Sequence, residues 1–160
     1  MPSTGGFGED TCRQCHWENP LNDPTGALTV EGVPARYTPG EDYPITVSVR
    51  RPGLIRAGFQ LSAREEGINM NAGSDAGVLA STNGMAEGVT AGPRGVTYMQ
   101  HTAAGAAAVT GDAARWTFTW TAPDGEVPVA FHVAANASNG DDSPLGDWIY
   151  TAAVNATPGR

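Results

Sequence analysis

The sequence predicts an all-β fold, an immunoglobulin-like antiparallel β-sandwich of seven to eight strands, and three observations support this prediction. Several short segments alternate apolar and polar residues with a period of two, as strands with one buried face do. Turn-forming residues are abundant, with 21 glycines and 12 prolines in 160 residues. Long segments with apolar residues at helical spacing are missing from the sequence. Many short strands joined by turns are typical of a sandwich.

In the first half of the chain, the segment 43–50 shows the alternation most clearly. It places Ile45, Val47 and Val49 on one face and polar residues on the other. Three further strands are predicted in this half, at residues 27–30, 58–64 and 78–79, with glycine-rich polar loops at residues 65–77 and 83–95.

In the second half, the segment 115–121 is the strongest strand prediction. Trp116, Phe118 and Trp120 share one face against threonines on the other, so these aromatic side chains are predicted to lie in the core. The alanine-rich run 103–108 is short and contains a glycine, which favours a loop over a helix. The remaining strands are predicted at residues 96–101, 127–135 and 148–154.

A C-x-x-C-H motif, formed by Cys12, Cys15 and His16, lies ahead of these strands. This spacing is the attachment motif of a c-type haem, in which both thiols bind the porphyrin and the histidine is an axial ligand of the iron. The motif therefore predicts one covalent haem c. A disulfide or redox-active cysteine pair is the alternative. Zinc is disfavoured because the chain has no further cysteine to complete a ligand set.

A haem iron in an electron carrier usually has a second axial ligand, commonly His or Met. His101 is the preferred candidate, because it ends a predicted strand beside small residues that would let a flat porphyrin approach. Trp17, directly after the motif, is expected to lie against the haem. The cofactor-binding set is thus Cys12, Cys15, His16, Trp17 and His101, and the other candidates for the second ligand are His132, Met70, Met85 and Met99.

The charge balance limits the classes of partner. The formal net charge is −8, and all nine basic residues are arginines. This disfavours nucleic acid and anionic membranes as partners and is compatible with a basic redox-partner protein. Common catalytic fingerprints are missing, which favours an electron carrier over an enzyme. The oligomeric state is left open.

The sequence contains neither a membrane-spanning apolar segment nor a signal peptide. Because haem is attached to such motifs outside the cytoplasm, we expect a periplasmic or cell-surface protein whose leader and C-terminal anchor lie outside this chain. Three parts are predicted: a flexible lead-in with the haem-attachment segment at residues 1–26, the sandwich at 27–154 and a tail at 155–160. The acidic loop 136–147 is a weaker candidate for a calcium site.

The order of several blocks resembles the reeler-like β-sandwich domains, and in particular the bacterial branch that carries C-x-x-C-H ahead of the sandwich, the choice-of-anchor V proteins. The resemblance implies an immunoglobulin-like sandwich, export and anchoring at the cell surface, but not a defined activity. The expected function is extracytoplasmic electron transfer by a monohaem c-type cytochrome. The alternative is a cell-surface interaction or adhesion module in which Cys12 and Cys15 form a disulfide. The blocks that carry the resemblance are residues 32–34, 37–40, 58–61, 101–102, 116–123, 134–140 and 146–151.

Overall fold

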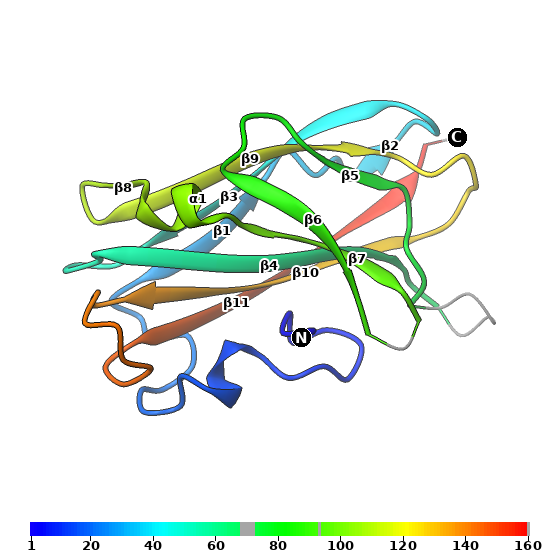
Figure 1. The fold of residues 1–160 in the computed structure, drawn as a ribbon. Helices are drawn as coiled ribbons and strands as arrows, with labels where there is room; N and C mark the ends of the chain where they lie inside the picture. Colours follow the sequence, from blue (N-terminus) through cyan, green and yellow to red (C-terminus); the bar gives the residue numbers. More distant parts are fainter. Residues whose placement is uncertain (68–72, 93, 160) are drawn as a thin grey trace.

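Two β-sheets packed face to face form the body of the protein, as a computed structural model shows (Figure 1). The structure describes residues 1–67, 73–92 and 94–159. All pairings between neighbouring strands are antiparallel except that of β2 with β11, which is parallel. The predicted all-β sandwich is confirmed.

The first sheet has six strands in the order β2-β11-β10-β4-β7-β6. Its centre is long and regular, because β10 pairs over its whole length with β4 and over nearly all of it with β11. The strands are β2 (Arg36–Tyr37), β4 (Arg56–Glu65), β6 (Ala86–Ala91), β7 (Val96–His101), β10 (Val129–Ser138) and β11 (Trp148–Pro158).

The second sheet has five strands in the order β1-β3-β9-β5, with the short β8 also paired to β9. Its strands are β1 (Ala27–Glu31), β3 (Asp42–Arg50), β5 (Val78–Ser81), β8 (Val109–Thr110) and β9 (Ala113–Thr121). Two short helical segments complete the described elements, η1 (Cys12–Gln14) and α1 (Ala103–Ala107). None of the helical segments described is long and apolar enough to cross a membrane.

The core lies between the sheets and is built from the alternating faces that the sequence predicts. Trp116, Phe118 and Trp120 of β9 are at most 1% exposed. Phe59 of β4 packs against Trp116, and Phe131 of β10 meets Trp120 edge-on. Aromatic pairs in these geometries add to the free energy gained by removing their apolar surface from water.

Three predictions about local structure are wrong. Residues 83–95 were predicted as a loop but contain β6, an edge strand that needs only β7 as a partner and so tolerates a weak strand sequence. Residues 103–107 form α1 rather than a loop, because the Thr102 side chain caps the helix by accepting from the Gly105 N–H. The last strand, β11, continues to Pro158 and so passes the predicted end of the sandwich at residue 154.

The predicted flexible lead-in packs against the outer face of the six-stranded sheet. The Ser3 N–H donates to Oε1 of Gln60 on β4 at 2.7 Å, and the ring of Phe7 meets His132 of β10 edge-on. Glu9 reaches the buried guanidinium of Arg64 on β4 and forms an ion pair with it. These contacts fix the position of the segment that carries the C-x-x-C-H motif.

Candidate functional site

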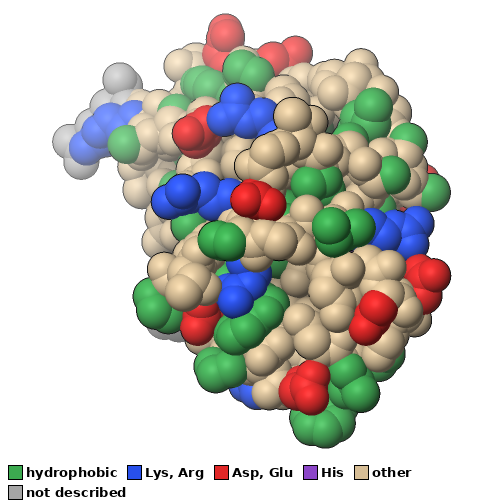
Figure 2. Space-filling view, turned by 90° about the vertical axis from the view of Figure 1, so that its left-hand side faces the viewer, with side chains coloured by type: hydrophobic (Ala, Val, Ile, Leu, Met, Phe, Trp, Pro, Cys, Tyr) green, Lys and Arg blue, Asp and Glu red, His purple; other side chains and the backbone are tan. Residues whose placement is uncertain are grey.

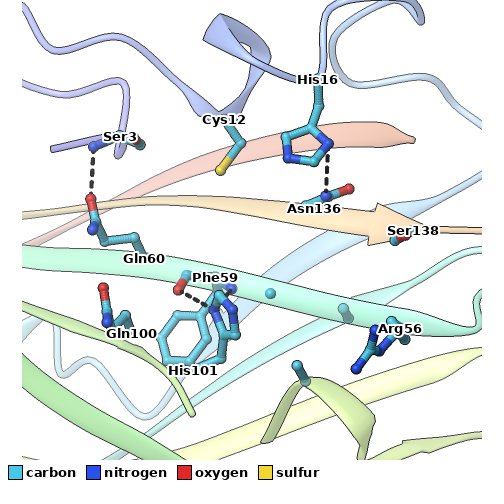
Figure 3. A pocket seen from close by; sticks show the side chains of 13 residues that line it. Ser3, Cys12, His16, Arg56, Phe59, Gln60, Gln100, His101, Asn136 and Ser138 are labelled. Carbon is cyan, nitrogen blue, oxygen red and sulfur yellow. Dashed lines mark hydrogen bonds between the residues drawn. The ribbon is translucent and has the colours of Figure 1, made fainter. Parts of the chain in front are cut away.

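A cavity of about 370 Å³ lies on the outer face of the six-stranded sheet (Figure 3). The N-terminal segment forms one wall, and the end of β7 with α1 forms the opposite wall. Strands β4 and β10 form the floor. Cavities that hold small ligands or cofactors begin at about 300 Å³. The lining residues include Cys12 and His16 of the motif and, from the opposite wall, His101.

The cysteines of the motif differ in their surroundings. Both are free thiols, and Cys12 contributes to the cavity wall while Cys15 is exposed and lies outside it. The turn η1 that carries Cys12 begins after Thr11, whose side chain accepts from the Arg13 N–H. Burial raises the pKa of the Cys12 thiol to about 11. A thiol with this pKa is protonated at neutral pH, which makes Cys12 a poor nucleophile in the folded motif.

The imidazole of His16 is fixed by a buried carboxylate. Its Nδ1 atom lies 2.7 Å from Oδ2 of Asp147, whose side chain is only 1% exposed. The Asn136 amide nitrogen lies 2.8 Å from the same carboxylate oxygen and 3.3 Å from Nδ1 of His16. A carboxylate only accepts hydrogen bonds, so Nδ1 of His16 carries a hydrogen, and in the neutral form of the ring the lone pair is on Nε2. Histidines that bind metals usually have their other nitrogen held in this way.

The loop between β10 and β11 holds the segment that follows the motif. The Gly146 N–H donates to the Glu18 carboxylate at 2.7 Å, and the Asn19 amide donates to the Asp147 carbonyl at 2.9 Å. The sequence singled out this loop only as a calcium candidate. Within the described ranges, no group of three or more His, Cys, Asp or Glu side chains is placed to hold a metal ion. The polar residues of this loop instead bond to one another and to the motif segment.

His101 lies where the ladder between β4 and β7 ends. Its Nδ1 atom is 3.0 Å from the nitrogen and 3.2 Å from the oxygen of Phe59. When the ring hydrogen is on Nε2, Nδ1 accepts from the Phe59 N–H. When the ring hydrogen is on Nδ1, this nitrogen donates to the Phe59 carbonyl, and only this tautomer leaves the Nε2 lone pair free. The ring lies against Gly58, where an added Cβ would come within 2.6 Å of Cε1. The imidazole can therefore occupy this position at the cavity only because residue 58 has no side chain.

Among the described residues, the other candidates for the second ligand, His132, Met85 and Met99, do not line this cavity. His132 is covered by Phe7 of the N-terminal segment, while Met99 is fully buried between the sheets. Met85 packs against the core, and Met70 lies outside the described residues. Trp17 is 61% exposed and does not line the cavity, so its contact with a haem remains a prediction.

The residues present fit a c-type haem in two respects, whereas the second thiol of the motif, that of Cys15, is exposed and lies outside the cavity. A thiol and two imidazoles from distant parts of the chain line one cavity. Each imidazole has a partner for Nδ1 that permits Nε2 to act as a ligand. The rest of the lining combines small residues, among them Gly58, Ala57 and Ala106, with the longer side chains of Arg56, Phe59 and Gln60.

Comparison with solved structures identifies the architecture. The human F-spondin reeler domain (fragment 1) is 21% identical, with a TM-score of 0.53 over 83% of this chain and 89% of that one. The fold is reeler-like. The Reelin-N domain of F-spondin gives a TM-score of 0.54 at 18% identity, over 92% of this chain and 97% of that domain. A second fragment of the human reeler domain gives 0.51 at 20% identity, over 90% and 98% of the two chains.

No known family model matches this chain, and no curated protein is detectably similar to it in sequence. At these levels of identity the solved structures show the fold alone. The overall fold is therefore similar to that of the reeler domains, while the chemistry at the cavity has to be argued from the residues of this chain.

Proposed function

We propose that this protein is a monohaem c-type cytochrome that transfers electrons outside the cytoplasm, with His16 and His101 as the axial ligands. One observation carries the proposal: the only two cysteines belong to a C-x-x-C-H motif, and the motif residues Cys12 and His16 share a cavity with His101. His101 is far away in sequence, so its arrival opposite the motif is a property of the fold.

The chain's own residues would perform two tasks. The thiols of Cys12 and Cys15 would hold the porphyrin through its two vinyl groups. Each attachment would exchange an S–H bond and a vinyl π bond for a C–S and a C–H bond, so no external oxidant would be needed. His16 and His101 would then present Nε2 atoms from opposite walls. When bound, the haem supplies a one-electron redox change at its iron.

Two imidazole ligands favour an electron carrier over a catalyst, because they leave the iron without an open position. They also favour a lower reduction potential than a His–Met pair would give. The partner would be another redox protein. Figure 2 shows acidic and arginine side chains interspersed with apolar ones over one end of the sandwich, so this end does not present a field of a single sign.

The ligand assignment is tested by replacing His101 with alanine in protein from a host that exports proteins and attaches haem to C-x-x-C-H motifs. We expect a change from a low-spin to a high-spin visible and electron paramagnetic resonance spectrum. His132→Ala is the matched control, since His132 lies on β10 but faces the N-terminal segment rather than this cavity. It should leave the spin state unchanged. A low-spin spectrum in His101→Ala that matches the parent protein would refute the assignment.

The similarity in fold to the reeler domains of F-spondin favours a second candidate, a cell-surface interaction module in which Cys12 and Cys15 form a disulfide. The similar solved structures support this candidate more directly than the haem proposal, which rests on the motif and the cavity. Intact mass separates the two candidates. A covalent haem adds its own mass, whereas a disulfide removes two hydrogens.

A further inference from the structure

The carboxylate of Asp147 lies beneath the motif histidine and makes three contacts. Oδ2 accepts from Nδ1 of His16 at 2.7 Å and from the Asn136 amide at 2.8 Å, while Oδ1 accepts from the Asn139 N–H at 3.3 Å. A charged group that is only 1% exposed requires such partners, because burying it without them is costly. Two of the three partners, His16 and Asn136, also line the cavity.

We propose that Asp147 is a positioning residue for His16, an inference that rests on the proposed haem function. By accepting the Nδ1 hydrogen, the carboxylate fixes one tautomer of His16 and leaves the Nε2 lone pair available toward the cavity. It also gives the ring partial imidazolate character, which makes Nε2 a stronger donor to a haem iron. A stronger donor stabilises the oxidised iron relative to the reduced iron, so Asp147 lowers the reduction potential.

A purely structural role for this carboxylate would be to hold the β10–β11 loop against the motif segment. Other groups already make that connection, because the Asp147 backbone carbonyl binds Asn19 and the Gly146 N–H binds Glu18. Two of the three hydrogen bonds of the side-chain carboxylate go instead to the cavity residues His16 and Asn136. A structural role would therefore change the free energy of unfolding, whereas a positioning role changes the potential as well.

The test is the reduction potential of haem-loaded Asp147→Asn, with Asp141→Asn as the matched control. Asp141 belongs to the same loop and is exposed, and its side chain accepts hydrogen bonds from Asn139 and Ser143 rather than from His16. Loss of an outer-shell partner typically changes metal affinity 10- to 100-fold. The same change in the ratio of oxidised to reduced protein would raise the potential by roughly 60–120 mV, at about 59 mV per decade. The control removes the same charge and should shift the potential much less.

Equal shifts in the two variants would overturn the inference and leave the haem proposal intact. If the parent protein carries no haem, the proposed function fails, and this inference fails with it. If Asp147→Asn does not fold, a measurement on the parent protein tests the inference instead. In its reduced, diamagnetic state, nuclear magnetic resonance of the ¹⁵N-labelled imidazoles should show a hydrogen on Nδ1 of His16. A His16 ring without that hydrogen would overturn the proposal.

Discussion

Replacing Glu9 with glutamine tests whether a buried ion pair fixes the segment that carries the motif. The Arg64 side chain is 2% exposed and that of Glu9 is 13% exposed, so the pair is largely shielded from water. Glu9 also accepts from Thr4 at 2.7 Å and from the Tyr98 hydroxyl. Breaking a buried pair by neutralising one partner leaves an unpaired charge and costs about 3–5 kcal/mol. Because glutamine keeps part of the hydrogen bonding, we expect about 3 kcal/mol.

Urea denaturation, analysed by linear extrapolation, gives the free energy of unfolding for this comparison. The matched control is Glu31→Gln, because Glu31 pairs with Arg115 at 3.1 Å while both side chains are more than 60% exposed. Exposed pairs contribute roughly 0–1 kcal/mol, so this change should be small. If Glu9→Gln costs no more than Glu31→Gln, the ion pair does not fasten the segment and the reasoning is wrong.

The same pair predicts a dependence on pH. Burial alone would raise the pKa of Glu9, but the hydrogen bonds from Tyr98, Arg64 and Thr4 and the charge of Arg64 outweigh it, and the pKa lies below its ordinary value of 4.5. A carboxyl with a depressed pKa in the folded state contributes stability above its unfolded pKa and loses it as the pH falls through the folded value. The difference in unfolding free energy between the parent and Glu9→Gln should therefore shrink below about pH 4.5.

Three further predictions concern the cavity, a histidine and the core. Gly58→Ala should displace the His101 ring, because the added Cβ would lie 2.6 Å from Cε1. The haem-loaded variant should therefore gain a partial high-spin signal, and a fully low-spin spectrum would contradict this. Burial, and after it the charge of Arg64, lower the pKa of His132 from 6.5 in the folded protein. The unfolded chain therefore binds a proton at a higher pH than the folded protein does, and part of the stability should be lost as the pH falls below 6.5. The urea midpoint of His132→Gln should lack this loss. Phe118→Ala, at a site that is 0% exposed, should cost about 3–5 kcal/mol of unfolding free energy by calorimetry or urea, and a cost below about 1 kcal/mol would mean that the core is misplaced.

The sandwich could be predicted from the sequence because the residues that face the core repeat with a period of two. Ile45, Val47 and Val49 on β3 and Trp116, Phe118 and Trp120 on β9 all lie inside, as their spacing indicates. The helix α1 could not be predicted from composition, because its start depends on the Thr102 cap. Gly105 is needed there since a Cβ would lie 1.9 Å from the Met85 carbonyl oxygen, a contact between distant residues.

The candidate site was predictable in part. The motif itself is local, and the choice of His101 depended on the small residues that follow it, one of which, Ala106, lines the cavity. The partnership of His16 with Asp147 joins residues at opposite ends of the chain, so nothing in the local sequence indicates it. A carboxylate between Gly146 and the apolar start of β11 was the one available hint, because a buried acidic residue needs a partner. The sequence instead suggested calcium for that loop.

Covalent attachment of haem is the central claim, and one measurement tests it most directly. The chain is produced with an added export leader in a host that attaches haem to C-x-x-C-H motifs, and the visible spectrum of the purified protein is recorded before and after reduction and after acid-acetone extraction. We predict sharp α and β bands on reduction and a Soret band that survives extraction. Both should disappear in a Cys12→Ala, Cys15→Ala double variant. A colourless parent protein from that host, with a mass lower by two hydrogens than that of the dithiol, would contradict the claim and favour the interaction module.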